Sequence, residues 1–214
     1  LDDNTRSQIS EALSEHLVLV FRGHDQPRDE DLVRFAESFG DLIKGSEWFR
    51  DVGDQPEILP VTNAVGEDGI PLGTGGSGPL EWHADYSYVD RPGKESFLNA
   101  VVLPDDSPCT YFCSQYTALE DLPTETADHL RSLRATHTIT GYVKDDIGSE
   151  DYELRNSFAA KRRRDDELGI QRPDIPEAEH PVIFKHPETG REILYVSRGI
   201  TRQIIGLPRE ESSA

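Results

Sequence analysis

The chain has 214 residues and carries 41 Asp and Glu against 22 Lys and Arg, which gives a formal net charge of −19 at pH 7. This acidic balance argues against a nucleic-acid partner, and no apolar run approaches the roughly 18 residues that a membrane span requires. With 35% hydrophobic residues and no signal-peptide pattern, we expect a single soluble, cytoplasmic domain over residues 1–214. Because the chain begins at Leu1 and contains no Met, we also expect it to be a piece of a longer polypeptide, cut at the C-terminus and at the N-terminus.

Two helices and two strands are predicted in the N-terminal third. Apolar residues at helical spacing predict a helix over 3–16, and the continuous apolar run over 17–21 predicts a buried strand after it. A second helix is predicted from an i, i+3, i+4, i+7 stripe that Gly40 would terminate, formed by Leu32, Phe35, Ala36 and Phe39. Residues 57–63 are then expected to form a short strand, followed by a glycine-rich loop over 66–78.

The remainder of the chain is predicted to be mainly strand. Turn residues separate the expected elements, which are strands over 82–89, 95–103 and 109–114, a helix over 124–134, a strand over 135–143, and a hairpin of 180–186 with 191–197. Residues 144–179 are highly charged without a clear period, and we expect a mobile segment there. In the predicted order, helices come first and are followed by strands that turns connect. This order favours an antiparallel sandwich or barrel with helices packed outside.

Cys109 and Cys113 are the two cysteines of the chain. At strand spacing they would lie roughly 13 Å apart, which is beyond the distance that a disulfide can bridge. We therefore expect buried, unpaired thiols.

The segment Trp82–Tyr88 carries the strongest chemical signal in the sequence. In a strand, His83, Asp85 and Ser87 would share one face, and Trp82, Ala84, Tyr86 and Tyr88 the other. An imidazole nitrogen beside a carboxylate oxygen is a common divalent-metal pair. One further histidine would complete the facial triad of non-haem Fe(II) oxygenases. A hydrogen-bonded pair on a strand surface is the alternative interpretation of a His-x-Asp motif.

Four sequence blocks, in one consistent order, resemble the taurine dioxygenase-like (TauD/TfdA) family of Fe(II)- and 2-oxoglutarate-dependent dioxygenases. The blocks are SEHLVLVFRGHDQPRDEDLVRFAESFGDL, LEWHADYSYVDRPGKESFLNAVVLP, CTYFCSQYTALEDLP and HPVIFKHPETGREILYVSRGITRQIIGL. The resemblance runs almost end to end. It implies a mainly β fold with flanking helices, a double-stranded β-helix (jelly roll, cupin-like).

The resemblance also implies a cofactor and its ligands. His83 and Asp85 would bind Fe(II), 2-oxoglutarate and O2 would be co-substrates, and Thr110 would bond the distal carboxylate of 2-oxoglutarate. The third iron ligand of the family, a histidine, and the arginine that pairs with the co-substrate carboxylate are both expected beyond Ala214. No earlier histidine of the chain, His137 and His180 included, is preferred as a substitute.

Four residues are expected near the substrate. The resemblance places Trp48 and Phe49 at the start of a substrate-side loop, Glu81 just before the metal strand, and Ile200 at a position that lines the pocket in relatives. A plain core isoleucine is an equally good interpretation of Ile200. Residues 144–179 would act as a lid over the site.

The implied activity is oxidation of an unactivated C–H of a small molecule, most simply hydroxylation, with release of succinate and CO2. Two alternatives remain at this point. One is a non-catalytic jelly-roll binding protein that has lost its iron site, and the other is a cupin-like enzyme with a different metal and no 2-oxoglutarate. The sequence leaves the substrate and homo-oligomerisation open.

Overall fold

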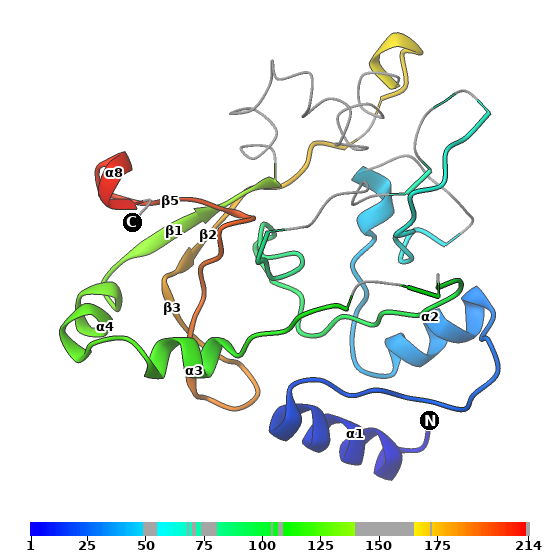
Figure 1. The fold of residues 1–214 in the computed structure, drawn as a ribbon, viewed down its shortest axis with the longest axis horizontal. Helices are drawn as coiled ribbons and strands as arrows, with labels where there is room; N and C mark the ends of the chain where they lie inside the picture. Colours follow the sequence, from blue (N-terminus) through cyan, green and yellow to red (C-terminus); the bar gives the residue numbers. More distant parts are fainter. Residues whose placement is uncertain are drawn as a thin grey trace.

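The protein is described from a computed structural model, which places residues 1–48, 55–67, 69, 72–73, 81–103, 105–106, 109–139, 165–171 and 173–212. Figure 1 shows the sheet elements and the helices near them on one side and the N-terminal helices on the other, with the non-helical segments 81–103 and 109–114 between them. The helices are α1 (Asp3–His16), α2 (Asp29–Glu37), α3 (Gln115–Glu120), α4 (Thr124–Leu130) and α8 (Arg209–Ser212), with a 3-10 turn η1 at Gly45–Trp48.

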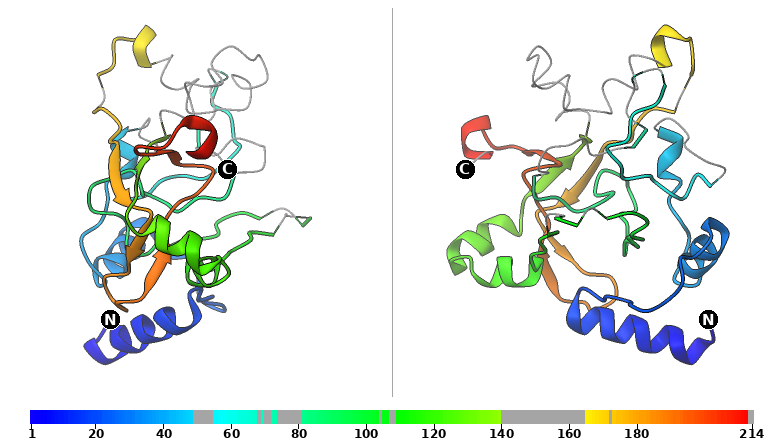
Figure 2. Two further views of the ribbon diagram at one scale, coloured as in Figure 1. Left: turned by 90° about the vertical axis from the view of Figure 1, so that its left-hand side faces the viewer. Right: turned by 45° about the vertical axis from the view of Figure 1, so that its right-hand side comes forward.

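The two N-terminal helices are confirmed. Helix α1 has the predicted bounds because Asp2 caps it, accepting a hydrogen bond from the Thr5 backbone N–H, and Leu17 ends it in a left-handed conformation (φ 64°). Helix α2 starts three residues before the apolar stripe and ends at Glu37, with Ser38 rather than Gly40 as its C-cap. In every view of Figures 1 and 2, α1 lies at the bottom of the molecule, below the β3–β4 hairpin.

Several predicted strands are wrong. Residues 17–21, 57–63, 82–89, 95–103 and 109–114 form no strand in the described structure. Their β-rich composition reports a preference for extended backbone, but a strand also needs a neighbour to complete its hydrogen bonds. Apolar side chains of these segments are accordingly exposed, among them Val20, Phe21, Leu98, Val101, Val102, Leu103, Tyr111 and Phe112.

The strands that do form make two antiparallel sheets. The first has the order β2-β1-β5, from β1 (Arg134–His137), β2 (Ala178–Pro181) and β5 (Thr201–Ile204), with a register irregularity between Thr136 and His137 on the β5 side. The second is the predicted late hairpin, confirmed as β3 (Ile183–Lys185) paired with β4 (Glu192–Leu194). Strand β1 ends at His137 rather than at 143, and β5 was not predicted.

The buried centre beside these sheets is unusually polar for a core. His137 and His180 are 1% and 4% exposed, and their ring centroids lie 5.3 Å apart. The ring of Tyr195 stacks on His137 at 5.4 Å and contacts Phe184 at 5.1 Å. Polar groups buried this deeply normally have hydrogen-bond partners, so the contacts of both histidines bear on what this core does.

Three further expectations have different outcomes. Both cysteines are free as predicted, but they are exposed rather than buried, because 109–114 lies on the surface without a covering layer among the described residues.

Of the expected lid over 144–179, residues 144–164 and 172 lie outside the described residues, and its last two residues begin β2. Among the described residues, no helix combines the length and the apolar character needed to cross a membrane.

The environment of His137 generates a prediction about stability. Burial, together with the neighbouring His180, lowers the pKa of His137 from 6.5 to about 4. Because the folded pKa lies below the unfolded one, the stabilisation is present above pH 6.5 and is lost as the pH falls toward 4. Lowering the pH from 7 to 5 should therefore remove about 2 kcal/mol of unfolding free energy through this group.

The measurement is urea unfolding at a series of pH values for the wild type and for His137→Phe, which retains a ring against Tyr195. The variant should show a shallower loss of stability between pH 7 and pH 5. Equal slopes in the two proteins would contradict the assignment of a neutral, buried imidazole at this position.

Candidate metal centre

The segment that carries His83 and Asp85 is a turn rather than the predicted strand. Residues 85–88 form the turn, and Tyr86 adopts a left-handed backbone conformation (φ 53°) that is uncommon for a residue with a side chain. The expected alternation of faces is therefore wrong for this segment. The two candidate ligands nevertheless meet, because His83 Nε2 lies 3.4 Å from Asp85 Oδ1.

Each of the two side chains is oriented by a second hydrogen bond. The His83 Nδ1–H group donates to the Glu81 backbone carbonyl at 2.7 Å, and the Ser96 hydroxyl donates to Asp85 Oδ2 at 3.2 Å. Both side chains are partly exposed, at 34% and 52%. The hydrogen bond between them raises the pKa of His83 and lowers the pKa of Asp85, and the Glu81 carbonyl adds to the first shift.

This donor arrangement fits a divalent transition metal. A metal-binding histidine usually donates its second N–H to a carbonyl or carboxylate, which leaves the other nitrogen to face the metal. His83 has that geometry, with Nε2 directed at the Asp85 carboxylate. The described residues contain no group of three or more His, Cys, Asp and Glu side chains that could hold a metal ion. His83 and Asp85 are therefore two candidate ligands of the predicted three.

The segment following β4 packs closely against the backbone at His83. The Gly199 N–H donates to the Trp82 carbonyl at 3.0 Å. A Cβ atom at position 199 would lie 3.1 Å from that carbonyl oxygen and 3.2 Å from His83 Cβ, so a side chain there would require its neighbours to shift by a few tenths of an ångström. Ile200, the next residue, is 7% exposed.

An aromatic cluster flanks the site. The rings of Trp48, Tyr86 and Tyr88 are mutual neighbours, with centroid separations of 5.8–6.1 Å. Burial raises the pKa of Tyr86 to about 12, and that of Tyr88 is raised as well, so both are neutral hydroxyls at physiological pH. Trp48 is thereby placed against the turn that carries Asp85.

The other predicted site residues are only partly brought together. Thr110 is exposed on an extended segment, and the Glu81 side chain is exposed while its backbone carbonyl holds His83. Phe49 lies outside the described residues. Sequence reasoning missed Ser96 and Gly199, and no motif marks either of them, since each acts through a contact with a residue distant in sequence.

Comparison with known proteins gives a consistent result. The family model described as "Taurine catabolism dioxygenase TauD, TfdA family" matches residues 1–214. The pentalenolactone F synthase of Streptomyces avermitilis is 35% identical over 209 residues, which cover 97% of this chain and 67% of that protein. The alpha-ketoglutarate-dependent 2,4-dichlorophenoxyacetate dioxygenase of a Burkholderia species is 30% identical over 200 residues, which cover 88% of this chain and 60% of that protein.

A solved structure supports the same fold. The crystal structure of a taurine dioxygenase from Burkholderia xenovorans aligns with a TM-score of 0.59 at 20% identity, covering all of this chain and 61% of that one. The chain thus spans 60–67% of the length of these three proteins.

The contact at Gly199 predicts a steric effect on metal binding. Gly199→Ala should weaken the affinity for Co(II) about 10-fold, because the new methyl group presses on the Trp82 carbonyl and on His83. Gly93→Ala is a matched control, since a Cβ there would meet Asp85 O and Tyr86 Cβ at an ordinary 3.7 Å. Titration of Co(II) absorption bands measures both affinities, and an equal effect of the two substitutions would contradict the prediction.

Proposed function

Because the chain belongs to the taurine catabolism dioxygenase TauD, TfdA family, we propose that it acts as an Fe(II)- and 2-oxoglutarate-dependent dioxygenase that hydroxylates an unactivated C–H of a small organic molecule. The observation that carries the proposal is the approach of His83 Nε2 to within 3.4 Å of Asp85 Oδ1. The remaining polar atoms of the two side chains, His83 Nδ1 and Asp85 Oδ2, are hydrogen-bonded to the Glu81 carbonyl and the Ser96 hydroxyl. The matched family model covers the chain from end to end, so this pair is not an isolated motif.

In this proposal the chain's own residues hold and orient the metal. His83 binds Fe(II) through Nε2, with its ring fixed by the bond from Nδ1–H to the Glu81 carbonyl. Asp85 binds through its carboxylate, which the Ser96 hydroxyl orients from the opposite oxygen. In this proposal a histidine from outside residues 1–214 is the third ligand, and an arginine, also from outside this segment, pairs with the co-substrate carboxylate. Thr110 donates its hydroxyl to the distal carboxylate of 2-oxoglutarate.

The cofactor supplies the oxidising chemistry. When bound, Fe(II) with 2-oxoglutarate and O2 supplies the oxidant that converts R–H to R–OH, while 2-oxoglutarate becomes succinate and CO2. The protein positions the substrate C–H and excludes water. The aromatic cluster of Trp48, Tyr86 and Tyr88 supports an apolar surface beside the metal, and Glu81 offers an exposed carboxylate at its edge.

The fold and setting complete the proposal. We propose that the two antiparallel sheets are part of a double-stranded β-helix, which the alignment with a taurine dioxygenase structure supports. A small molecule is the partner proposed for the site, and the cytoplasm is the proposed location.

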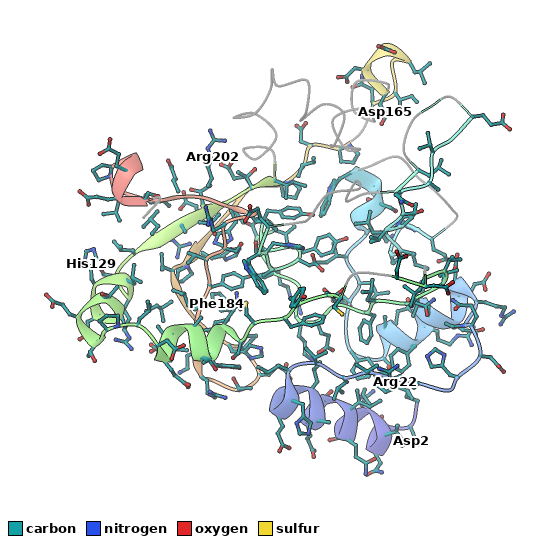
Figure 3. The ribbon with its side chains drawn as sticks, in the orientation of Figure 1. Asp2, Arg22, His129, Asp165, Phe184 and Arg202 are labelled. Carbon is teal, nitrogen blue, oxygen red and sulfur yellow. The ribbon has the colours of Figure 1, made fainter. Side chains whose placement is uncertain are left out.

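The first test is the visible absorption band of the Fe(II)–2-oxoglutarate chelate, recorded anaerobically on the full-length gene product. We expect a weak charge-transfer band in the wild type and none in His83→Ala or Asp85→Ala, since each variant lacks a ligand. His129→Ala is the matched control, because this histidine projects outward from α4 (Figure 3) and should leave the band intact. A wild type without the band would reject the proposal and favour a non-catalytic binding protein.

A second test concerns Thr110. Replacing it with valine removes one hydrogen bond to a charged carboxylate, which should raise the Kd for 2-oxoglutarate about 10-fold. Thr110→Ser retains the hydroxyl and should bind as the wild type does. The same charge-transfer band measures the Kd for 2-oxoglutarate of each variant. Equal Kd values for Thr110→Val and Thr110→Ser would contradict this role.

A further inference from the structure

Two buried histidines of the three-stranded sheet reach the segment that carries the metal ligands. His137 is the last residue of β1, and His180 lies on β2. Both form hydrogen bonds to residues two and four positions after Asp85 in the chain, namely Ser87 and Val89. This arrangement deepens the proposed function, on which the inference rests.

The His137 ring makes a single side-chain hydrogen bond among the described residues. Its Nδ1 shares a hydrogen bond of 3.1 Å with the Ser87 hydroxyl, and both residues are 1% exposed. The other ring nitrogen, Nε2, is buried without a hydrogen-bond partner among the described residues. The imidazole is therefore fixed by Ser87 and by its stacking on Tyr195.

His180 makes the equivalent contact two residues further along. Its Nε2–H group donates to the Val89 backbone carbonyl at 3.1 Å. The ring is 4% exposed and contacts both His137 and Tyr195 edge-on. Because the acceptor is a backbone carbonyl, this buried hydrogen bond fixes the backbone position of Val89 rather than a side chain.

The turn 85–88, which contains Ser87 and directly precedes Val89, needs such support. Tyr86 is held at φ 53°, and a left-handed conformation of a non-glycine residue costs of order 1 kcal/mol and persists where its surroundings determine it. On the other side of the ligands, the Gly199 N–H bonds to the Trp82 carbonyl. The segment 82–89 is thus tied to the sheet region before His83 and after Asp85.

We propose that His137 and His180 are positioning residues of the metal centre, which hold the turn 85–88 through Ser87 and Val89 and thereby fix the Asp85 carboxylate opposite His83. Neither histidine is a ligand. The alternative is that they fill the core without affecting metal binding, and the two accounts differ in what a substitution does to metal affinity.

The test measures Co(II) affinity and the apoprotein melting temperature together, on the full-length gene product. His137→Phe keeps the ring but loses the bond, and Ser87→Ala leaves Nδ1 unpaired. Each substitution should weaken Co(II) binding about 10-fold, the lower end of the range for groups that orient metal ligands. The double variant should bind no more weakly than the weaker single variant, because it removes both partners of one bond.

Conservative variants separate position from packing. His180→Gln retains a donor near the position of Nε2 and should bind Co(II) nearly as the wild type does, whereas His180→Phe should not. His137→Asn retains a group near Nδ1 and should recover part of the lost affinity. His186→Phe is the matched control, because this half-buried histidine of the β3–β4 hairpin packs on Tyr116 instead.

The outcomes distinguish this inference from the proposed function. A wild type that binds no Co(II) would overturn the function. A wild type that binds Co(II), with Ser87→Ala and His180→Phe binding equally well, would overturn the positioning role alone. Losses of affinity that merely follow the melting temperature, with the same relation in His186→Phe, would also overturn it. Should His137→Phe fail to fold, the milder Ser87→Ala variant carries the same prediction.

Discussion

The approach of His83 Nε2 to within 3.4 Å of Asp85 Oδ1 is the constraint on which the candidate site depends. On a flat strand, alternate residues share a face but stand about 6.6 Å apart, too far for their polar atoms to converge without bending of the side chains. The turn at 85–88 and the positive φ of Tyr86 bring the two groups together. The conformation of this turn is thus what brings the side chains of His83 and Asp85 within 3.4 Å of each other.

A strained turn must be held by the structure around it, and the sheet supplies that support. The order β2-β1-β5 places His180 and His137 side by side, and it places the residues before β5 against Trp82. The hydrogen bonds of His137 and His180 satisfy polar groups that would otherwise be unpaired in this core. Its hydrogen bonds cross to the ligand segment, and its aromatic ring, Tyr195, stacks on the anchoring imidazole. Fold and site are therefore coupled through a few long-range bonds.

The features that could be predicted from sequence are those with local causes. Helix α1 follows from its cap and apolar period, and the β3–β4 hairpin from its turn, where Gly190 has φ 69°. The closeness of His83 to Asp85 was also predicted, although on a strand that does not form. The strands expected at 95–103 and 109–114 failed because apolar alternation does not specify a pairing partner. The contacts of Ser96, Gly199 and His137 join residues far apart in the chain, and single-sequence patterns carry no information about such pairs.

The most direct test of the account is whether His83 binds metal through Nε2 with its Nδ1–H on the Glu81 carbonyl. Proton NMR of the Co(II)-substituted full-length gene product reports such a proton as a strongly shifted, solvent-exchangeable resonance. The account predicts at least one such resonance that disappears in His83→Gln while the apoprotein stays folded. A spectrum without shifted exchangeable resonances, or one that His83→Gln leaves unchanged, would contradict it.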